Sequence, residues 1–109
     1  MKLIQSIIRP EKLNDVVTAL RSVASGMTIS EVRGYGHQRG QSAIYRGAEY
    51  EVKLLPKIMI EIVADDNKVD DILRIVVQTA RTGNIGDGRI FIRAVEQAYH
   101  VRTGFMELD

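Results

Sequence analysis

Apolar residues recur along the chain at two spacings, one typical of strands and one typical of helices. β-Branched or alternating apolar runs predict strands over residues 2–8, 28–35, 57–63 and 90–95. In the third of these, Ile58, Ile60 and Ile62 share one face. Apolar side chains at i, i+3, i+4 and i+7 predict amphipathic helices over residues 13–24 and 69–80.

Turn-forming and capping residues bound these elements. Pro10 suits the first turn of a helix, and Gly26 is expected to end that helix. Asp65 and Asp66 supply capping oxygens for the second helix, which is expected to close near Gly83. After the last strand we expect a short extended tail that carries Tyr99, His100, Val101 and Arg102.

The resulting order, β-α-β-β-α-β, predicts a ferredoxin-like domain of the α/β (α+β) class over residues 1–109. Right-handed crossovers place both helices on one face of the sheet. The other face carries an apolar patch of Met59, Val63, Phe91 and Val95. A patch of this size is unusual on a small monomer, so we expect a closed homo-oligomer to bury it.

The connection from Gly34 to Pro56 is far longer than a hairpin needs. Connections of roughly twenty residues indicate a binding loop, a disordered segment or a misassigned element. Four glycines, three tyrosines and two arginines lie in this one, which favours a binding loop.

A second loop, residues 82–89, is rich in glycine and ends in Arg89. Gly83, Gly86 and Gly88 allow backbone N–H groups to converge as an anion-binding nest. Glycine-rich turns are common, however, so phosphate binding and a plain turn both remain open. Asp87 is equally suited to forming the turn and to binding a ligand.

The composition excludes several classes of function. The 109 residues carry a net charge of only +1, so we expect no broad basic surface that would bind nucleic acid or a membrane. No cysteine is present, and neither histidine has partners at metal-ligand spacing, so a protein-only metal site is not expected. No secretory signal, membrane span or catalytic motif is recognised, and we expect a cytoplasmic protein that is not an enzyme.

With these residues assembled, the chain resembles the PII signal-transduction proteins, a nitrogen-regulatory family. Residues 45–50, Tyr-Arg-Gly-Ala-Glu-Tyr, match the family's modification-site signature in its T-loop (about 36–55). Residues 79–91 match its second signature, which includes the B-loop (about 81–89). Shorter matches occur at 7–10, 34–40, 55–57 and 102–104, so the similarity runs end to end, through a C-terminal loop of about 98–109.

The resemblance implies a homotrimer that binds ATP or ADP competitively in the clefts between subunits. The implied nucleotide-binding residues are Ile7, Thr28, Gly34, Gly36, Gln38, Glu61, Val63, Gly86, Asp87, Gly88, Arg89, His100, Arg102 and Thr103. Gln38 would also ligate Mg²⁺ together with ATP and 2-oxoglutarate. The implied 2-oxoglutarate residues are Arg9, Gly36, Gln38, Arg39, Gly40, Lys57 and Gly86, with Lys57 pairing a carboxylate.

The same resemblance implies regulation of nitrogen assimilation through T-loop contacts. Implied partners are an ammonium transporter, nitrogen-assimilation enzymes, a sensor kinase and a nucleotidyltransferase that modifies Tyr50. Membrane association would occur only through a transporter, and no nucleic acid is expected as a partner. Ala48 stands where some members carry a phosphorylated serine, which excludes that modification.

Two positions depart from the family pattern. Arg39 stands where lysine is usual, and His100 stands where many members have a second phosphate-binding arginine. Histidine replaces a permanent charge with one that titrates near neutral pH, so we expect ATP to lose more affinity than ADP.

Three alternatives remain. One is a PII-like adenine-nucleotide sensor that regulates another membrane transporter without 2-oxoglutarate. The second is a slow nucleotide hydrolase, for which no positioned base is recognised. The third is a structural trimer without a ligand. We do not expect the sheet to bind RNA, because this would need several stacking aromatic residues and Phe91 is the only aromatic residue on the expected central strands.

Overall fold

The computed structural model describes residues 1–35 and 54–107, and within these ranges it contains one antiparallel sheet and two helices. The strands are β1 (Lys2–Ile8), β2 (Thr28–Gly34), β3 (Leu55–Ala64) and β4 (Gly88–Ala94). The helices are α1 (Leu13–Leu20) and α2 (Val69–Ala80), each preceded by a 3₁₀ turn, Pro10–Lys12 and Asp66–Lys68.

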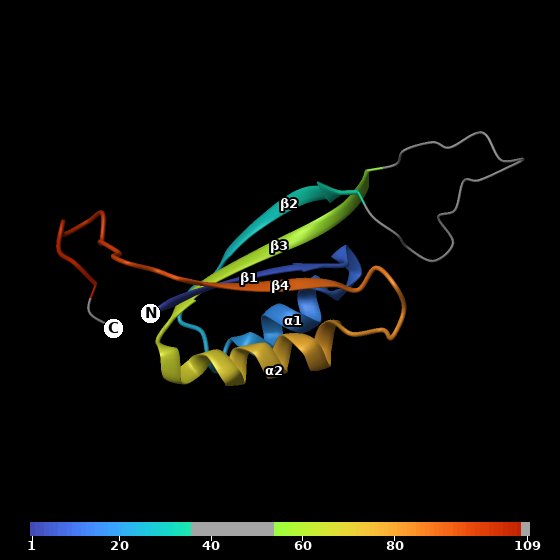
Figure 1. Ribbon diagram of the computed structural model, residues 1–109, viewed down its shortest axis with the longest axis horizontal. Coiled ribbons are helices and arrows are strands. Elements are labelled where there is room, and N and C mark those ends of the chain that lie inside the picture. Colours follow the sequence, from blue (N-terminus) through green and yellow to red (C-terminus); the bar gives the residue numbers. More distant parts are fainter. Residues whose placement is uncertain (36–53, 108–109) are drawn as a thin grey trace, which may run out of the picture.

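The sheet has the order β2-β3-β1-β4, with β1 and β3 at its centre. All neighbouring strands run antiparallel, and both helices cover the same face of the sheet (Figure 1). This arrangement confirms the predicted ferredoxin-like fold.

The core lies between that face and the helices. The alternation predicted for β3 is confirmed, because Ile58, Ile60 and Ile62 are buried while their neighbours face the other way. From the helices, the buried side chains are Val16, Leu20, Ile72, Val76 and Ala80. The apolar side chains of the helices recur with the helical period, and those of the strands alternate with a period of two. The two sets pack against each other in one apolar core.

Helix boundaries differ from the prediction. α1 ends at Leu20 rather than Ala24, although the N–H groups of Val23 and Ala24 still donate to the Leu20 carbonyl oxygen at 3.0 and 2.9 Å. α2 covers the predicted residues 69–80, but it ends at Ala80 without a further turn towards Gly83, because Arg81 is extended (ψ 133°).

The expected capping by Asp65 and Asp66 is also wrong. Asp65 occupies the N-cap position of the 3₁₀ turn without a side-chain capping bond. Asp66 instead accepts a 2.8 Å hydrogen bond from the amino group of Met1. The Asp66 carboxylate therefore pairs with the charged amino group of Met1 and does not cap the helix.

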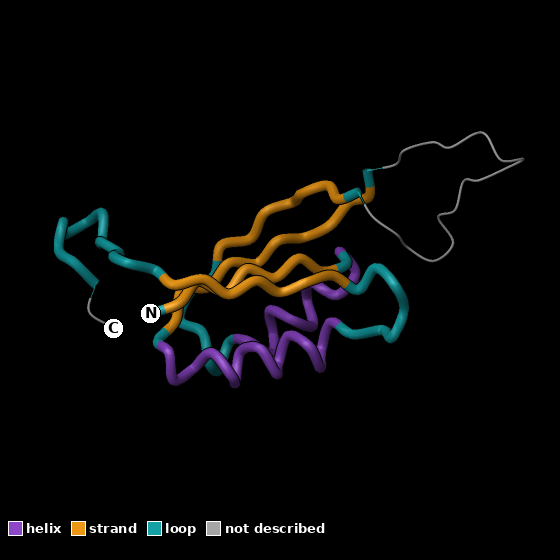
Figure 2. The backbone as a smooth tube through the Cα atoms, in the orientation of Figure 1, coloured by secondary structure: helices purple, strands orange, loops and turns teal. Residues whose placement is uncertain are grey.

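The face of the sheet opposite the helices is not covered by any described element (Figures 1 and 2). Val63 and Phe91 on this face are 45% and 44% exposed, whereas Met59 and Val95 are half-buried. The predicted apolar patch is therefore present, and the homo-oligomer that would bury it remains a prediction.

The predicted extended tail is wrong. The chain after β4 folds back on itself, since Tyr99 pairs with Met106 and residues 101–103 form a turn. Backbone hydrogen bonds join His100 to Phe105 (3.0 Å) and Gly104 to His100 (2.8 Å). Gly104 has φ +74°, a conformation that a glycine adopts without strain.

The two ends of the sheet carry different segments. The loop between α2 and β4 lies at the same end of the sheet as the end of β2 and the start of β3, between which the predicted T-loop runs in sequence (Figure 1). The folded C-terminal segment lies at the opposite end. Most of the predicted T-loop, residues 36–53, lies outside the described residues.

Candidate functional site

The α2–β4 loop brings the predicted anion-binding glycines together. Gly83, Gly86 and Gly88 all have positive φ, at 90°, 103° and 118°. At Gly88 a side chain has no room, because a Cβ atom would lie 1.8 Å from the carbonyl oxygen of Ile7. The loop therefore begins β4 by passing directly over the end of β1, and this close approach requires glycine.

Asp87 hydrogen-bonds to the first residues of its own loop. Its carboxylate accepts hydrogen bonds from the backbone N–H groups of Thr82 (2.8 Å) and Gly83 (2.9 Å) and from the Thr82 hydroxyl. Arg9, at the end of β1, adds an ion pair from Nε at 3.0 Å. Burial acts to raise the pKa of Asp87, but these hydrogen bonds outweigh it and hold the pKa well below its ordinary value. Asp87 is thus ionised and fully engaged with the loop.

Two cations hold the next carbonyl groups. Arg9 also donates to the Ile85 carbonyl oxygen at 2.9 Å, and Lys57 donates from Nζ to the Gly86 carbonyl oxygen at 2.7 Å. Burial, followed by the positive charge of Arg9, lowers the pKa of Lys57. The Lys57 side chain is thus half-buried, with the Gly86 carbonyl oxygen as a partner.

This geometry determines what the loop can bind. In a trans peptide the C=O and N–H groups point in opposite directions. With the Ile85 and Gly86 carbonyl groups turned towards Arg9 and Lys57, the N–H groups of Gly86 and Asp87 point away from those cations. Consecutive N–H groups of this kind suit an anion such as a phosphate.

A second group of predicted residues lies on the uncovered face of the sheet. Thr28 on β2 is directly opposite Glu61 on β3, and Val63 follows on the same face of β3. Glu61 accepts a 3.1 Å hydrogen bond from the amide of Gln5. Ile7 pairs with Arg89 in the register of β1 and β4, nearer the glycine loop.

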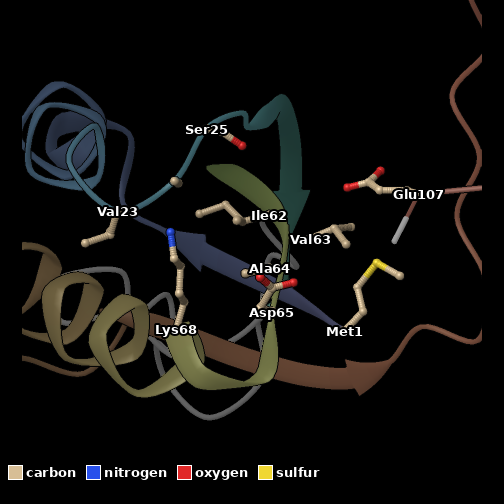
Figure 3. A pocket seen from close by; sticks show the side chains of 10 residues that line it. Met1, Val23, Ser25, Ile62, Val63, Ala64, Asp65, Lys68 and Glu107 are labelled. Atoms are coloured by element: carbon tan, nitrogen blue, oxygen red, sulfur yellow. The ribbon is translucent and has the colours of Figure 1, made fainter. Parts of the chain in front are cut away.

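A pocket of about 180 Å³ adjoins this second group (Figure 3). Its walls come from the turn after α1, the end of β3 and the C-terminal segment. The lining includes Ser25, Val63, Asp65, Lys68 and Glu107. Its exposed lining is mostly polar, because Asp65, Lys68 and Glu107 contribute to it beside Val63.

The third group, His100, Arg102 and Thr103, lies in the folded C-terminal segment. His100 approaches Glu107, with 3.9 Å between Nε2 and Oε1, and Thr103 accepts a 3.1 Å hydrogen bond from the N–H of Phe105. All three belong to the segment at the far end of the sheet from the glycine loop (Figure 2).

The structure thus unites some predicted site residues and separates others. Arg9, Lys57 and residues 86–89 form one cluster; Thr28, Glu61 and Val63 form another; His100 to Thr103 form a third. Gly34 lies beside Lys57, with Lys57 Cγ 3.6 Å from the Cβ position that Gly34 lacks. Gly36, Gln38, Arg39, Gly40 and Tyr50 lie outside the described residues.

The sequence did not predict two of these contacts. Thr82 donates a hydrogen bond to Asp87, and Gln5 donates one to Glu61. A threonine at the start of the glycine loop, five residues before an aspartate, was the sequence feature that could have indicated the first contact. Among the described residues, no group of histidine or acidic side chains is placed to hold a metal ion, and no helix is long and apolar enough to cross a membrane.

Comparison with known proteins agrees with this arrangement. A family model described as nitrogen regulatory protein P-II matches residues 1–105. A nitrogen regulatory protein P-II of Nostoc punctiforme is 53% identical over 105 residues, covering 95% of this chain and 94% of its own length. The Haemophilus influenzae protein of the same name and the nitrogen regulatory protein P-II 1 of Escherichia coli are each 50% identical, with the same coverage of both chains.

Proposed function

Since the chain belongs to the nitrogen regulatory protein P-II family, a family of signal-transduction regulators and not of enzymes, we propose that it senses adenine nucleotides between its own subunits. In this proposal the protein is a cytoplasmic homotrimer. ATP or ADP occupies each cleft between subunits, and 2-oxoglutarate joins ATP there. The T-loop then reports the ligand state to target proteins of nitrogen assimilation, such as an ammonium transporter.

The observation that carries the proposal is the separation of the three site groups. The glycine loop suits phosphate, and Thr28, Glu61 and Val63 lie on the open face of the sheet, but His100 and Arg102 lie in the segment at the end opposite the glycine loop. One chain cannot surround a nucleotide with all of them. A head-to-tail neighbour would bring its C-terminal segment to the glycine loop, which is how a heterologous ring closes.

The open face of the sheet supports the same assembly. Val63 and Phe91 are each more than two-fifths exposed on a face that no described element covers. Burial of such a face in a ring contributes about 25 cal/mol for each Å² of apolar surface.

The cations near Gly86 support the second ligand. The Lys57 ammonium lies 2.7 Å from the Gly86 carbonyl oxygen, so it places a positive charge beside the glycine loop that attracts a carboxylate. The charge of Arg9 adds positive potential at the same place. A dicarboxylate beside the glycine loop is therefore favoured, and Gln38 is proposed to link it to Mg²⁺ and ATP.

Calorimetric titration and chromatography with light scattering test the proposal together. We expect a trimer that binds ADP alone, and binds 2-oxoglutarate only when Mg-ATP is present. Binding of nucleotide without any response to 2-oxoglutarate would favour the alternative sensor of another transporter. A monomer that ignores both nucleotides would refute the proposal.

A further inference from the structure

The ends of the glycine loop are joined by Thr82 and Asp87. The Thr82 hydroxyl donates to one Asp87 carboxylate oxygen, and the Thr82 N–H donates to the other at 2.8 Å. The same hydroxyl oxygen accepts a 3.1 Å hydrogen bond from the N–H of Asn84. One small side chain thus connects the beginning, the middle and the end of the loop.

Arg9 fixes this closed loop to the sheet. Its guanidinium holds Asp87 at 3.0 Å and the Ile85 carbonyl oxygen at 2.9 Å. The Arg9 and Asp87 side chains are only 11% and 24% exposed, so solvent screens the pair less than it screens a surface pair. The loop is held at both ends by Thr82, Arg9 and Asp87, which lie just after α2, just after β1 and just before β4.

The contacts have an electrostatic consequence. A carboxylate that faced the ligand would repel a phosphate, but the Asp87 oxygens are taken by Thr82, Gly83 and Arg9. Its charge therefore faces inward, and the N–H groups of Gly86 and Asp87 face outward. The loop is preset for an anion before any ligand arrives, which reduces the ordering cost of binding.

We propose that Thr82 is a positioning residue for the nucleotide phosphates, and that with Asp87 it forms a clasp that sets the loop without touching the ligand. The proposal rests on the proposed nucleotide function and adds a residue to it. It also assigns Asp87 an internal role: its carboxylate acts on phosphate through the loop backbone.

The test compares ADP with adenosine on the intact oligomer by calorimetry. Thr82→Val removes the hydroxyl at nearly constant shape, and we expect ADP affinity to fall about tenfold, the effect of losing one hydrogen bond to a charged group. Adenosine has no phosphate, so its affinity should stay within about twofold. Thr82→Ser restores the hydroxyl and should restore ADP binding.

Thr79→Val is the matched control. The Thr79 hydroxyl donates to the Ile75 carbonyl oxygen within α2 at 2.7 Å and lies outside the clasp. We expect this variant to bind ADP as the wild type does.

Asp87→Asn supplies a second, independent readout should Thr82→Val fail to fold. Direct repulsion between Asp87 and phosphate predicts tighter ADP binding in this variant, whereas the clasp predicts weaker binding. Tighter or unchanged ADP binding by Asp87→Asn would overturn the proposal.

Equal losses of ADP and adenosine in Thr82→Val would also overturn it, because the hydroxyl would then serve the fold in general. Unchanged ADP binding in Thr82→Val would have the same effect while leaving the nucleotide function intact. A wild-type protein that binds no ADP would refute the nucleotide function itself.

Discussion

The Nζ atom of Lys57, near the start of β3, donates a 2.7 Å hydrogen bond to the carbonyl oxygen of Gly86, in the loop before β4. β3 begins directly after the predicted T-loop, and Gly86 lies in the glycine loop. A physical contact therefore joins the base of one loop to the backbone of the other. A ligand that engages Lys57 acts at the place where both loops meet.

Lys57→Met tests the role of this lysine, since methionine keeps an apolar stem and removes the charge. With Mg-ATP present, we expect 2-oxoglutarate affinity to fall at least tenfold, because a charge-assisted hydrogen bond contributes about 1.5–3 kcal/mol. Calorimetry measures this, with ADP binding by the same variant as the internal control. Unchanged 2-oxoglutarate affinity would show that the acid binds elsewhere.

Gly88→Ala tests the close approach of the glycine loop to β1. The new Cβ atom would meet the Ile7 carbonyl oxygen at a backbone φ of 118°, so we expect a loss of at least about 3 kcal/mol in unfolding free energy. Gly83→Ala shares the positive φ but meets nothing within 4 Å, so it should cost only about 1–2 kcal/mol. Urea unfolding measures both, and equal losses would rule out the steric explanation.

Acid unfolding tests the charge of Asp87. Its pKa is lowered in the folded state, so its stabilisation is present above the unfolded pKa of about 4 and is lost as the pH falls further. We expect Asp87→Asn to be about 2 kcal/mol less stable at pH 7, and this difference to shrink towards pH 2. Urea unfolding at several pH values measures it. A difference that stays constant across that range would indicate lost packing and not lost charge.

His100→Arg tests the departure from the family pattern in the C-terminal segment. Arginine carries a permanent charge and five N–H donors, so we expect the variant to bind ATP about tenfold more tightly than the wild type at pH 8. ADP binding should tighten less. Calorimetry with both nucleotides measures this, and an unchanged ATP affinity would show that residue 100 does not contact the phosphates.

Much of the fold followed from local patterns, and the exceptions have physical causes. The period of Ile58, Ile60 and Ile62 predicted a one-sided strand, and burial against two helices confirms it. The tail was predicted as extended because its fold depends on pairing between Tyr99 and Met106, which no local period reveals.

The site was predictable in its residue types but not in its connections. The three glycines before β4 indicated an anion loop, whereas the partner of Asp87 is Arg9, 78 residues away in sequence. Such a contact depends on how β1 and β4 are aligned in the sheet. Long-range register of this kind is fixed by the whole fold and leaves no signal near either residue.

Mixing two binding-deficient variants tests most directly whether each nucleotide lies between two chains. Arg89→Ala impairs the glycine loop and Arg102→Ala impairs the C-terminal segment, so neither homo-oligomer should bind ADP. In a randomly mixed head-to-tail ring, about a quarter of the clefts combine an intact loop with an intact tail. The expected result of titrating the co-refolded mixture is ADP binding at wild-type affinity in about that fraction of sites, and a mixture that binds no more ADP than its two parents would contradict the account.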